Sequence, residues 1–171
     1  FVPYIQIRGN HEYRGADPSG FFRYFGTMDE QSYFAFTAGD AIFIVLDTGE
    51  DNPPSKGLKN MLFDQEQLLA DERVWLEELV ASPQFKNAKF RIVLSHAAPH
   101  MDGSYISGFV RRLTDGIFLG KNPSASISLW MAGHVHFYAR TNPENPAECY
   151  ARLNAAPDGE LMPPYTRFPL I

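Results

Sequence analysis

Three apolar runs of this chain each end in a short polar segment that contains histidine. The first run, Phe1 to Arg8, leads into Gly-Asn-His-Glu at 9–12. The second, Phe90 to Leu94, leads into Ser95-His96, and the third, Ile127 to Ala132, leads into Gly-His-Val-His at 133–136. Each run predicts a strand, and the last two have the continuous apolar character of strands covered on both faces. Because ligands collect at the carboxyl ends of strands in open α/β sheets, we expect the polar segments to share one sheet edge.

The rest of the chain alternates strand and helix signals. Aromatic and β-branched residues at Ser32 to Thr37 and Ala41 to Leu46 flank Ala-Gly-Asp, which predicts a hairpin. Apolar residues recur at helical spacing from Asp64, an N-cap candidate, to Ser82, with Pro83 just beyond. Ile106 to Leu113 predicts a short helix. The fold class is therefore α/β.

Composition limits the classes of protein. A length of 171 residues with 44% hydrophobic residues is enough for one core, which predicts a single domain over 1–171. The formal net charge of -5 argues against nucleic-acid or membrane-surface binding through bulk positive charge. No apolar run reaches the ~18 residues of a membrane span. The single cysteine, Cys149, excludes an internal disulfide and a cysteine metal cage but leaves the compartment open.

The histidines have the chemistry of a metal site when they are taken together. A lone loop histidine is most often structural, so no one of them carries the hypothesis. His134 and His136 are two residues apart after Gly133, which lets the backbone bend so that each ring faces a different ion. Neutral imidazole binds Zn, Fe, Ni and Mn, and the amide oxygen of Asn10 suits harder divalent cations. An Asn and His set at one edge is a plausible metal site.

The order of these segments resembles that of a known family. "GNHE" at 9–12, "VLSHAAPH" at 93–100 and "GHVH" at 133–136, each after an apolar strand, resemble the last three motifs of the calcineurin-like metallophosphoesterases. The resemblance runs from Phe1 to about Tyr138. It implies a two-sheet α/β/β/α sandwich that holds two metal ions ~3.5–4 Å apart, the arrangement that clamps a phosphoryl group.

The resemblance also implies roles for individual residues. Asn10, His96 and His134 would bind one metal ion and His136 the other, with Mn, Fe or Zn as the candidate metals. His11 would lie beside the scissile phosphate, where it would stabilise charge or protonate the leaving oxygen. The nucleophile would be a metal-bridging hydroxide that hydrolyses a phosphomonoester or phosphodiester.

Other polar residues near the motifs keep two interpretations. Glu12 either hydrogen-bonds to a metal ligand or stabilises the turn, or it is a solvated loop carboxylate. His100 either faces the substrate or is a surface histidine. Asp47 ends a strand, but the corresponding position in the resembling family is structural. The aromatic segment at 20–26 is expected to pack a loop onto the core.

The family's first two motifs, Asp-x-His and Gly-Asp-x-x-Asp, do not occur here, and the latter supplies the carboxylate that bridges both ions. "AGDAIF" at 38–43 contains Gly-Asp, but it follows "GNHE" and lies in the predicted hairpin. We therefore expect a partial domain that lacks its first strands, with a further strand opening at 167–171. The isolated chain is expected to bind metal weakly, to show little or no turnover, and to pair with another chain or aggregate through exposed strand edges.

Three other classes were weighed. A non-catalytic scaffold of the same fold is the alternative, but it would be expected to have lost the acid histidine or several ligands. An amidohydrolase-type zinc enzyme places its His-x-His pair after the first barrel strand, whereas here the pair comes late. A purely structural protein leaves the three histidine-bearing strand ends unexplained.

Overall fold

The fold was analysed in a computed structural model of the chain. The structure describes residues 4–14, 17–25, 31–53, 55, 64–99, 105–134, 136, 138–140 and 150–152. His100 and the segment at 167–171 lie outside the described residues.

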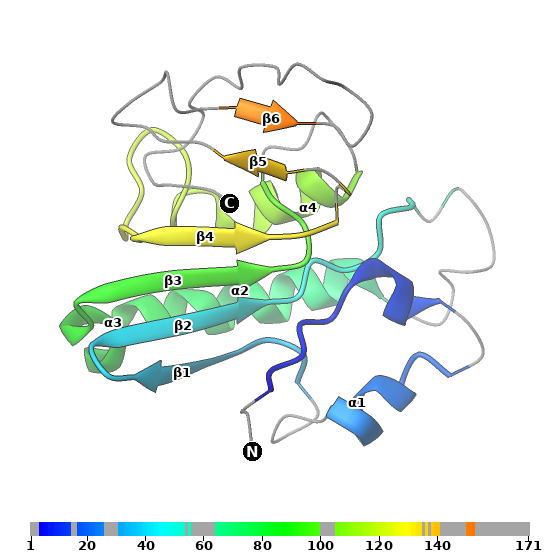
Figure 1. Cartoon of the computed structure of the whole chain (residues 1–171), viewed down its shortest axis with the longest axis horizontal. Coiled ribbons are helices and arrows are strands. Elements are labelled where there is room, and N and C mark those ends of the chain that lie inside the picture. Colours follow the sequence, from blue (N-terminus) through cyan, green and yellow to red (C-terminus); the bar gives the residue numbers. More distant parts are fainter. Residues whose placement is uncertain are drawn as a thin grey trace.

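A four-stranded sheet with the order β1-β2-β3-β4 forms the centre of the molecule (Figure 1). β1 (Phe34–Ala38) pairs antiparallel with β2 (Ala41–Leu46), and the two join through a turn in which Gly39 has φ 59°. β2 pairs parallel with β3 (Phe90–Ser95), and β3 pairs parallel with β4 (Leu129–Ala132). Because β2, β3 and β4 run in the same direction, the segments that follow them emerge at one edge, as the sequence predicts.

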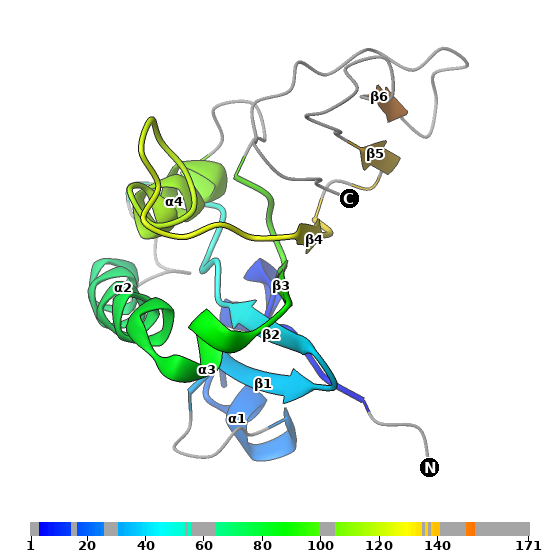
Figure 2. The same cartoon turned by 90° about the vertical axis from the view of Figure 1, so that its left-hand side faces the viewer.

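Three helices cover one face of this sheet: α2 (Gln65–Ala81), α3 (Pro83–Asn87) and α4 (Tyr105–Thr114) (Figure 2). The side chain of Asp64 accepts a hydrogen bond from the Gln67 amide, so the predicted N-cap is confirmed. α2 ends where the sequence predicts, and Pro83 then opens α3 instead of a loop because its ring suits the first turn of a helix.

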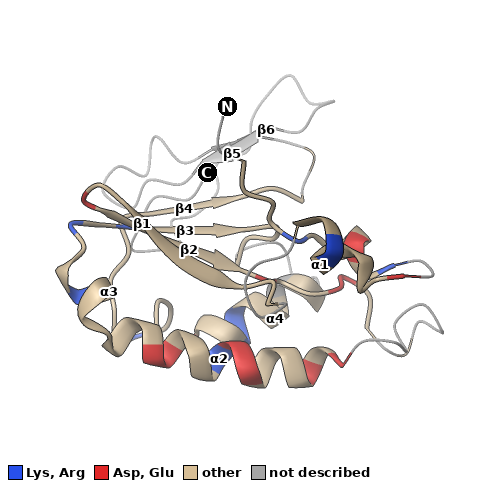
Figure 3. Ribbon diagram, turned by 90° about the horizontal axis from the view of Figure 1, so that it is seen from below, with Lys and Arg blue, Asp and Glu red and all other residues tan. Residues whose placement is uncertain are grey.

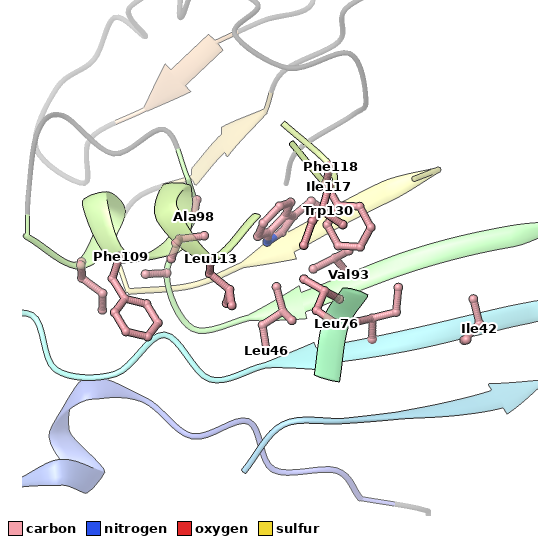
Figure 4. Close-up of a cluster of buried hydrophobic side chains, with 14 of the residues drawn as sticks. Ile42, Leu46, Leu76, Val93, Ala98, Phe109, Leu113, Ile117, Phe118 and Trp130 are labelled. Atoms are coloured by element: carbon pink, nitrogen blue, oxygen red, sulfur yellow. The ribbon is translucent and has the colours of Figure 1, made fainter. Parts of the chain in front are cut away.

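The core lies between the sheet and these helices (Figure 4). Alternate residues of the strands point toward it because strand side chains alternate between faces. The chain's longest helix contributes Leu76, which is fully buried. Other fully or nearly fully buried side chains come from the sheet, from α4 and from the segment that follows α4: Ile42, Ile44, Leu46, Val93, Ile106, Phe109, Val110, Leu113, Ile117, Phe118 and Trp130.

The predicted strand over Phe1 to Arg8 is wrong for its described part. Residues 4–9 have no strand conformation, and Tyr4 and Ile5 are 74% and 43% exposed. An apolar pattern identifies side chains that favour burial, but a strand also needs a neighbour for its backbone groups, and none of the described strands pairs with this segment. The segment instead leads into the 3-10 turn η1 (Asn10–Tyr13) and, further on, α1 (Gly20–Phe25).

A separate two-stranded antiparallel sheet, β5 (Tyr138–Arg140) with β6 (Tyr150–Arg152), was not predicted from the sequence.

Acidic residues predominate on α2, which carries five of them and one arginine (Figure 3). Among the described residues, no helix is long and apolar enough to cross a membrane.

Candidate metal centre

Two of the three histidine-bearing segments meet where their strands end. His96 directly follows β3, and His134 comes two residues after β4. The amide of Gly133 donates a hydrogen bond to the carbonyl of His96 at 2.9 Å, which holds the two strand exits together. His134 itself has a φ of 71°, in the left-handed region.

The third segment, η1, brings Asn10 to the same point. Asn10 Oδ1 lies 2.8 Å from His96 Nε2, across 86 residues of sequence. The same Nε2 atom lies 3.1 Å from His134 Nδ1, and the two imidazole rings are nearly perpendicular, with centroids 4.9 Å apart. Of the three residues predicted as ligands of one ion, Asn10 and His134 thus each place one atom within contact distance of the third, His96.

The chemistry of these three atoms fits a shared cation. His96 Nε2 faces both Asn10 Oδ1 and His134 Nδ1, but a single ring proton can satisfy only one acceptor at a time. Donor atoms that bind one ion at ~2.1 Å lie about 3 Å apart, close to the separations observed. Among the described residues, no group of three or more His, Cys, Asp or Glu forms a metal cage, so the amide of Asn10 is needed to complete this set.

Burial prepares the same residues for a cation. Asn10 is 1% exposed, and its Nδ2 atom is buried with no hydrogen-bond partner in the structure. The pKa of His96 is lowered chiefly by burial, and next by the charge of His134. Burial also lowers the pKa of His134. Both rings are therefore biased toward the neutral form that binds metals.

His11 and His136 lie near the centre. His11 is exposed on η1, and its Nε2 lies 3.4 Å from Arg14 Nη1. His136 is also exposed. Charge on either ring would lower the pKa values of both His96 and His134, so both lie within electrostatic range of the centre. The role of His136 as ligand of a second ion stays a prediction.

Gly9 allows η1 to approach His96. A Cβ atom at this position would lie 3.0 Å from His96 Nδ1 and 2.8 Å from Glu12 Oε2. The Glu12 carboxylate accepts a hydrogen bond from the Gly9 amide at 2.8 Å and so closes the turn. The structure thus favours the turn-steadying interpretation of Glu12, although the residue is exposed.

A buried polar network anchors the far end of η1. Asp47, fully buried at the end of β2, accepts hydrogen bonds from the Tyr13 hydroxyl and from the amide of Gly49, the latter at 2.9 Å. Its own amide donates to Glu72 Oε1 on α2 at 2.9 Å. Arg8 lies 3.9 Å from the Asp47 carboxylate and stacks over the Tyr13 ring at 3.7 Å. Asp47 therefore supports the turn that carries Asn10 and His11, in agreement with its structural interpretation.

Sequence reasoning did not find Tyr13, Arg14, Glu50 and Glu72 as parts of the site. Tyr13 and Arg14 directly follow the "GNHE" segment, and Glu50 follows the end of β2, so their places near strand ends were the available signal. Glu72 gave none, because a carboxylate in the middle of an amphipathic helix predicts a solvated position. Of the aromatic segment, Phe21 is buried as the predicted packing requires, whereas Tyr24 and Phe25 are exposed.

A groove at the opposite edge of the sheet carries no histidine. Its lining includes Asp40, Gln84, Asn87 and Lys89, next to the starts of β2 and β3. The chemistry-bearing residues instead gather at the carboxyl ends of the parallel strands, where α/β sheets place their ligand sites.

Comparison with known proteins identifies the family of this chain. The family model of the calcineurin-like phosphoesterases matches residues 1–138, and the chain therefore belongs to that family. Comparisons with curated proteins and with solved structures gave no match. The mixed α/β sheet with its helices is the fold class that the sequence predicts, and the family is one of phosphoric-ester hydrolases that generally bind divalent metals.

Proposed function

We propose that this chain carries part of the dinuclear centre of a metal-dependent phosphoesterase, which hydrolyses phosphomonoesters or phosphodiesters. The observation that carries the proposal is that Asn10 Oδ1 and His134 Nδ1 lie 2.8 and 3.1 Å from the same atom, His96 Nε2. His136, two residues beyond His134, would be a ligand of a second ion. Bound Mn, Fe or Zn would supply the positive charge that an acidic chain lacks and would activate water for attack.

The protein's own residues have separate tasks in this proposal. His11 is exposed beside the centre, where its imidazole would stabilise charge on the phosphoryl oxygens or give a proton to the leaving oxygen. Glu12 and Gly9 hold the turn at the distance that lets Asn10 reach His96. Tyr13 and Asp47 fix the other end of that turn.

Metal binding tests the centre before any turnover is measured. Isothermal titration of the chain with Mn²⁺ should show binding that His96→Ala abolishes and Asn10→Ala weakens. Lys89→Ala, at the opposite edge of the sheet, is the control and should bind as the wild type does. Equal Mn²⁺ affinity in the wild type and His96→Ala would contradict the proposed centre.

Hydrolysis separates the enzyme from the scaffold alternative. Turnover of p-nitrophenyl phosphate and bis(p-nitrophenyl) phosphate by the Mn²⁺-loaded chain is expected to be slow, because the family's bridging carboxylate belongs to a motif that this sequence lacks. Whatever hydrolysis is measured should fall by about 10²-fold or more in His11→Ala, within the usual range for removing a general acid. A chain that binds Mn²⁺ but hydrolyses neither ester, even at long incubation, would favour the non-catalytic scaffold.

Self-association through strand edges stays a prediction. β1 and β4 are the outer strands of the described sheet, and an outer strand presents unpaired backbone groups. Light scattering checks this prediction, and a monomer at all concentrations would contradict it.

A further inference from the structure

Arg14 stands out in the neighbourhood of His11 because one of its nitrogens has no carboxylate partner. Arg14 Nε and Nη2 donate to the Glu50 carboxylate at 2.9 and 2.6 Å, and Nη2 also pairs with Asp51. The remaining nitrogen, Nη1, contacts only His11 Nε2 among the described residues, at 3.4 Å. The guanidinium is thus held along one side and open along the other.

Glu50 provides a rigid anchor for this arginine. Its side chain is 2% exposed, whereas that of Arg14 is 27% exposed. The peptide groups on either side of the Glu50 side chain are fixed by Gln65, the first residue of α2, which accepts from the Glu50 amide and donates to its carbonyl, both at 3.2 Å. A chain of hydrogen bonds therefore runs from the start of α2 through Glu50 to Arg14.

The position of Arg14 also relates it to the centre itself. The charges of Arg14 and Asp51 both act on His134, the former lowering and the latter raising the pKa of that ring. Arg14 therefore lies within electrostatic range of His134 as well as in contact with His11. Arg14, Glu50 and Asp51 together carry a net charge of -1, so this cluster does not attract anions by bulk charge and its contribution would be directional.

We infer that Arg14, anchored through Nε and Nη2 to Glu50, presents Nη1 beside His11 as a hydrogen-bond donor for a non-bridging oxygen of the substrate's phosphoryl group. The inference rests on the proposed function, because the phosphoryl group is placed at the Asn10-His96-His134 centre. A planar guanidinium held along one side by a carboxylate keeps the N–H groups of its other nitrogen in a fixed direction, which lysine does not reproduce.

The test measures binding of phenylphosphonate, a non-hydrolysable phosphoryl compound, to the chain in saturating Mn²⁺. Isothermal titration compares the wild type with Arg14→Gln and Arg14→Lys. Arg23→Gln is the matched control, because Arg23 is an exposed arginine on α1 whose carboxylate partner, Asp17, is also exposed. Mn²⁺ affinity and the circular dichroism melting curve are recorded for every variant.

The expected result is a loss of phenylphosphonate affinity of roughly tenfold or more in Arg14→Gln, as for a hydrogen bond to a charged group, and a smaller loss in Arg14→Lys. Mn²⁺ affinity should be unchanged in both variants, and Arg23→Gln should match the wild type throughout. If Arg14→Gln does not fold, the loss in Arg14→Lys decides the matter.

Four results would overturn the inference, and they are distinguishable. Unchanged phenylphosphonate affinity in the Arg14 variants would overturn the inference. So would a wild type that binds Mn²⁺ but not phenylphosphonate. Neither result would contradict the proposed metal centre. Loss of Mn²⁺ together with phenylphosphonate in those variants would assign Arg14 to the support of the centre instead. A wild type that binds no Mn²⁺ overturns the proposed function, and the inference with it.

Discussion

Two regions of the sheet bury different kinds of side chain. One is the face covered by α2 and α4, and the other is the edge at which β2, β3 and β4 end. The covered face is filled by apolar side chains such as Trp130, Val93 and Leu76, which are fully buried (Figure 4). The edge buries charged and polar groups instead, among them Asp47 and Glu72, both fully buried.

The two regions therefore keep their shape by different forces. Apolar packing is non-directional and stabilises any arrangement that fills space well. The edge depends on individual hydrogen bonds, and several of its atoms, including Arg8 Nε, Asn10 Nδ2 and Glu72 Oε2, are buried with no partner in the structure. Each such atom opposes folding by ~1–3 kcal/mol. The core therefore supplies stability, whereas the hydrogen bonds of the edge fix the positions of Asn10 and the histidines at a cost in stability.

The largest expected effect lies in the core. Trp130→Ala should lower the free energy of unfolding by about 3–5 kcal/mol, because it leaves a cavity under α4 and removes the indole hydrogen bond to Ser95, which is 2.7 Å long. Chemical denaturation measures the change. Val74→Ala, on the exposed side of α2, is the control and should stay within ~0.5 kcal/mol of the wild type. A loss below 1 kcal/mol for Trp130→Ala would contradict the statement that apolar packing on the covered face stabilises the fold.

The next effect concerns the edge, and metal affinity is its measure. Gly9→Ala places a methyl group 3.0 Å from His96 Nδ1 and 2.8 Å from Glu12 Oε2, so η1 or the His96 ring must shift. We expect Mn²⁺ affinity to fall by roughly 10- to 100-fold, as when a supporting group of a metal site is changed. Gly108→Ala is the matched control, because its methyl group on α4 meets nothing within 4 Å. That change should raise stability by about 0.5–1 kcal/mol and leave Mn²⁺ affinity unchanged.

A third effect distinguishes two buried carboxylates by pH. Burial, and next the charge of Asp47, raises the pKa of Glu72 well above its ordinary value of 4.5. The folded chain then holds a proton that the unfolded chain releases, so the stability linked to Glu72 is complete below pH 4.5 and is lost as pH rises through the raised pKa. Glu72→Gln should remove this alkaline loss and be more stable than the wild type at pH 8, by an amount on the order of 1–3 kcal/mol.

Glu50 should show the opposite dependence of stability on pH in the same experiment. Although burial opposes ionisation, hydrogen bonds from Arg14 help to lower the pKa of Glu50 from 4.5 to about 2. Its contribution to stability is therefore present above pH 4.5 and lost as pH falls toward 2. Denaturation curves from pH 2 to pH 9 should show Glu50→Gln flatter on the acid side and Glu72→Gln flatter on the alkaline side. Two variants with the same pH profile would contradict these assignments.

The smallest expected effect is at the surface. The pair of Glu66 with Arg112 joins α2 to α4 at 2.8 Å, but the two side chains are 64% and 48% exposed. Because water and salt screen such pairs, Glu66→Ala should cost less than ~1 kcal/mol in the free energy of unfolding. The cost should shrink further in 1 M NaCl, where charges are screened over a few ångströms. A larger cost that persists in salt would mean that this surface contact supports the core.

Much of the covered face could be predicted from the sequence, although α3 could not. The helix from Asp64 to Ser82 and the strands at Ala41 to Leu46 and Phe90 to Leu94 match the structure within a residue at each end. The spacing of apolar residues in these elements predicts which side chains are buried, because the strands are paired with one another and the helix packs on them. The run from Phe1 to Arg8 shows the limit, since a similar apolar pattern there has no strand partner among the described residues.

The candidate site could be predicted only in part, for a related reason. The ligand-type residues Asn10, His96 and His134 are recognisable by chemistry and by their place after strands. Glu72 and Arg14 are not, because their importance comes from contacts with Asp47 and Glu50 that are distant in sequence. A sequence pattern reports what a side chain is able to do, whereas the partners that orient it are set by the three-dimensional fold.

The backbone angle of His134 has a consequence for the evolution of this edge. A φ of 71° places a residue with a Cβ atom in a strained conformation that costs on the order of 1–3 kcal/mol and that glycine would adopt freely. Replacing His134 by glycine would thus relieve strain while removing a ring that lies 3.1 Å from His96. Selection for stability alone would favour the glycine at this position. If His134 binds metal as proposed, the imidazole at this position lowers local stability in exchange for a ligand.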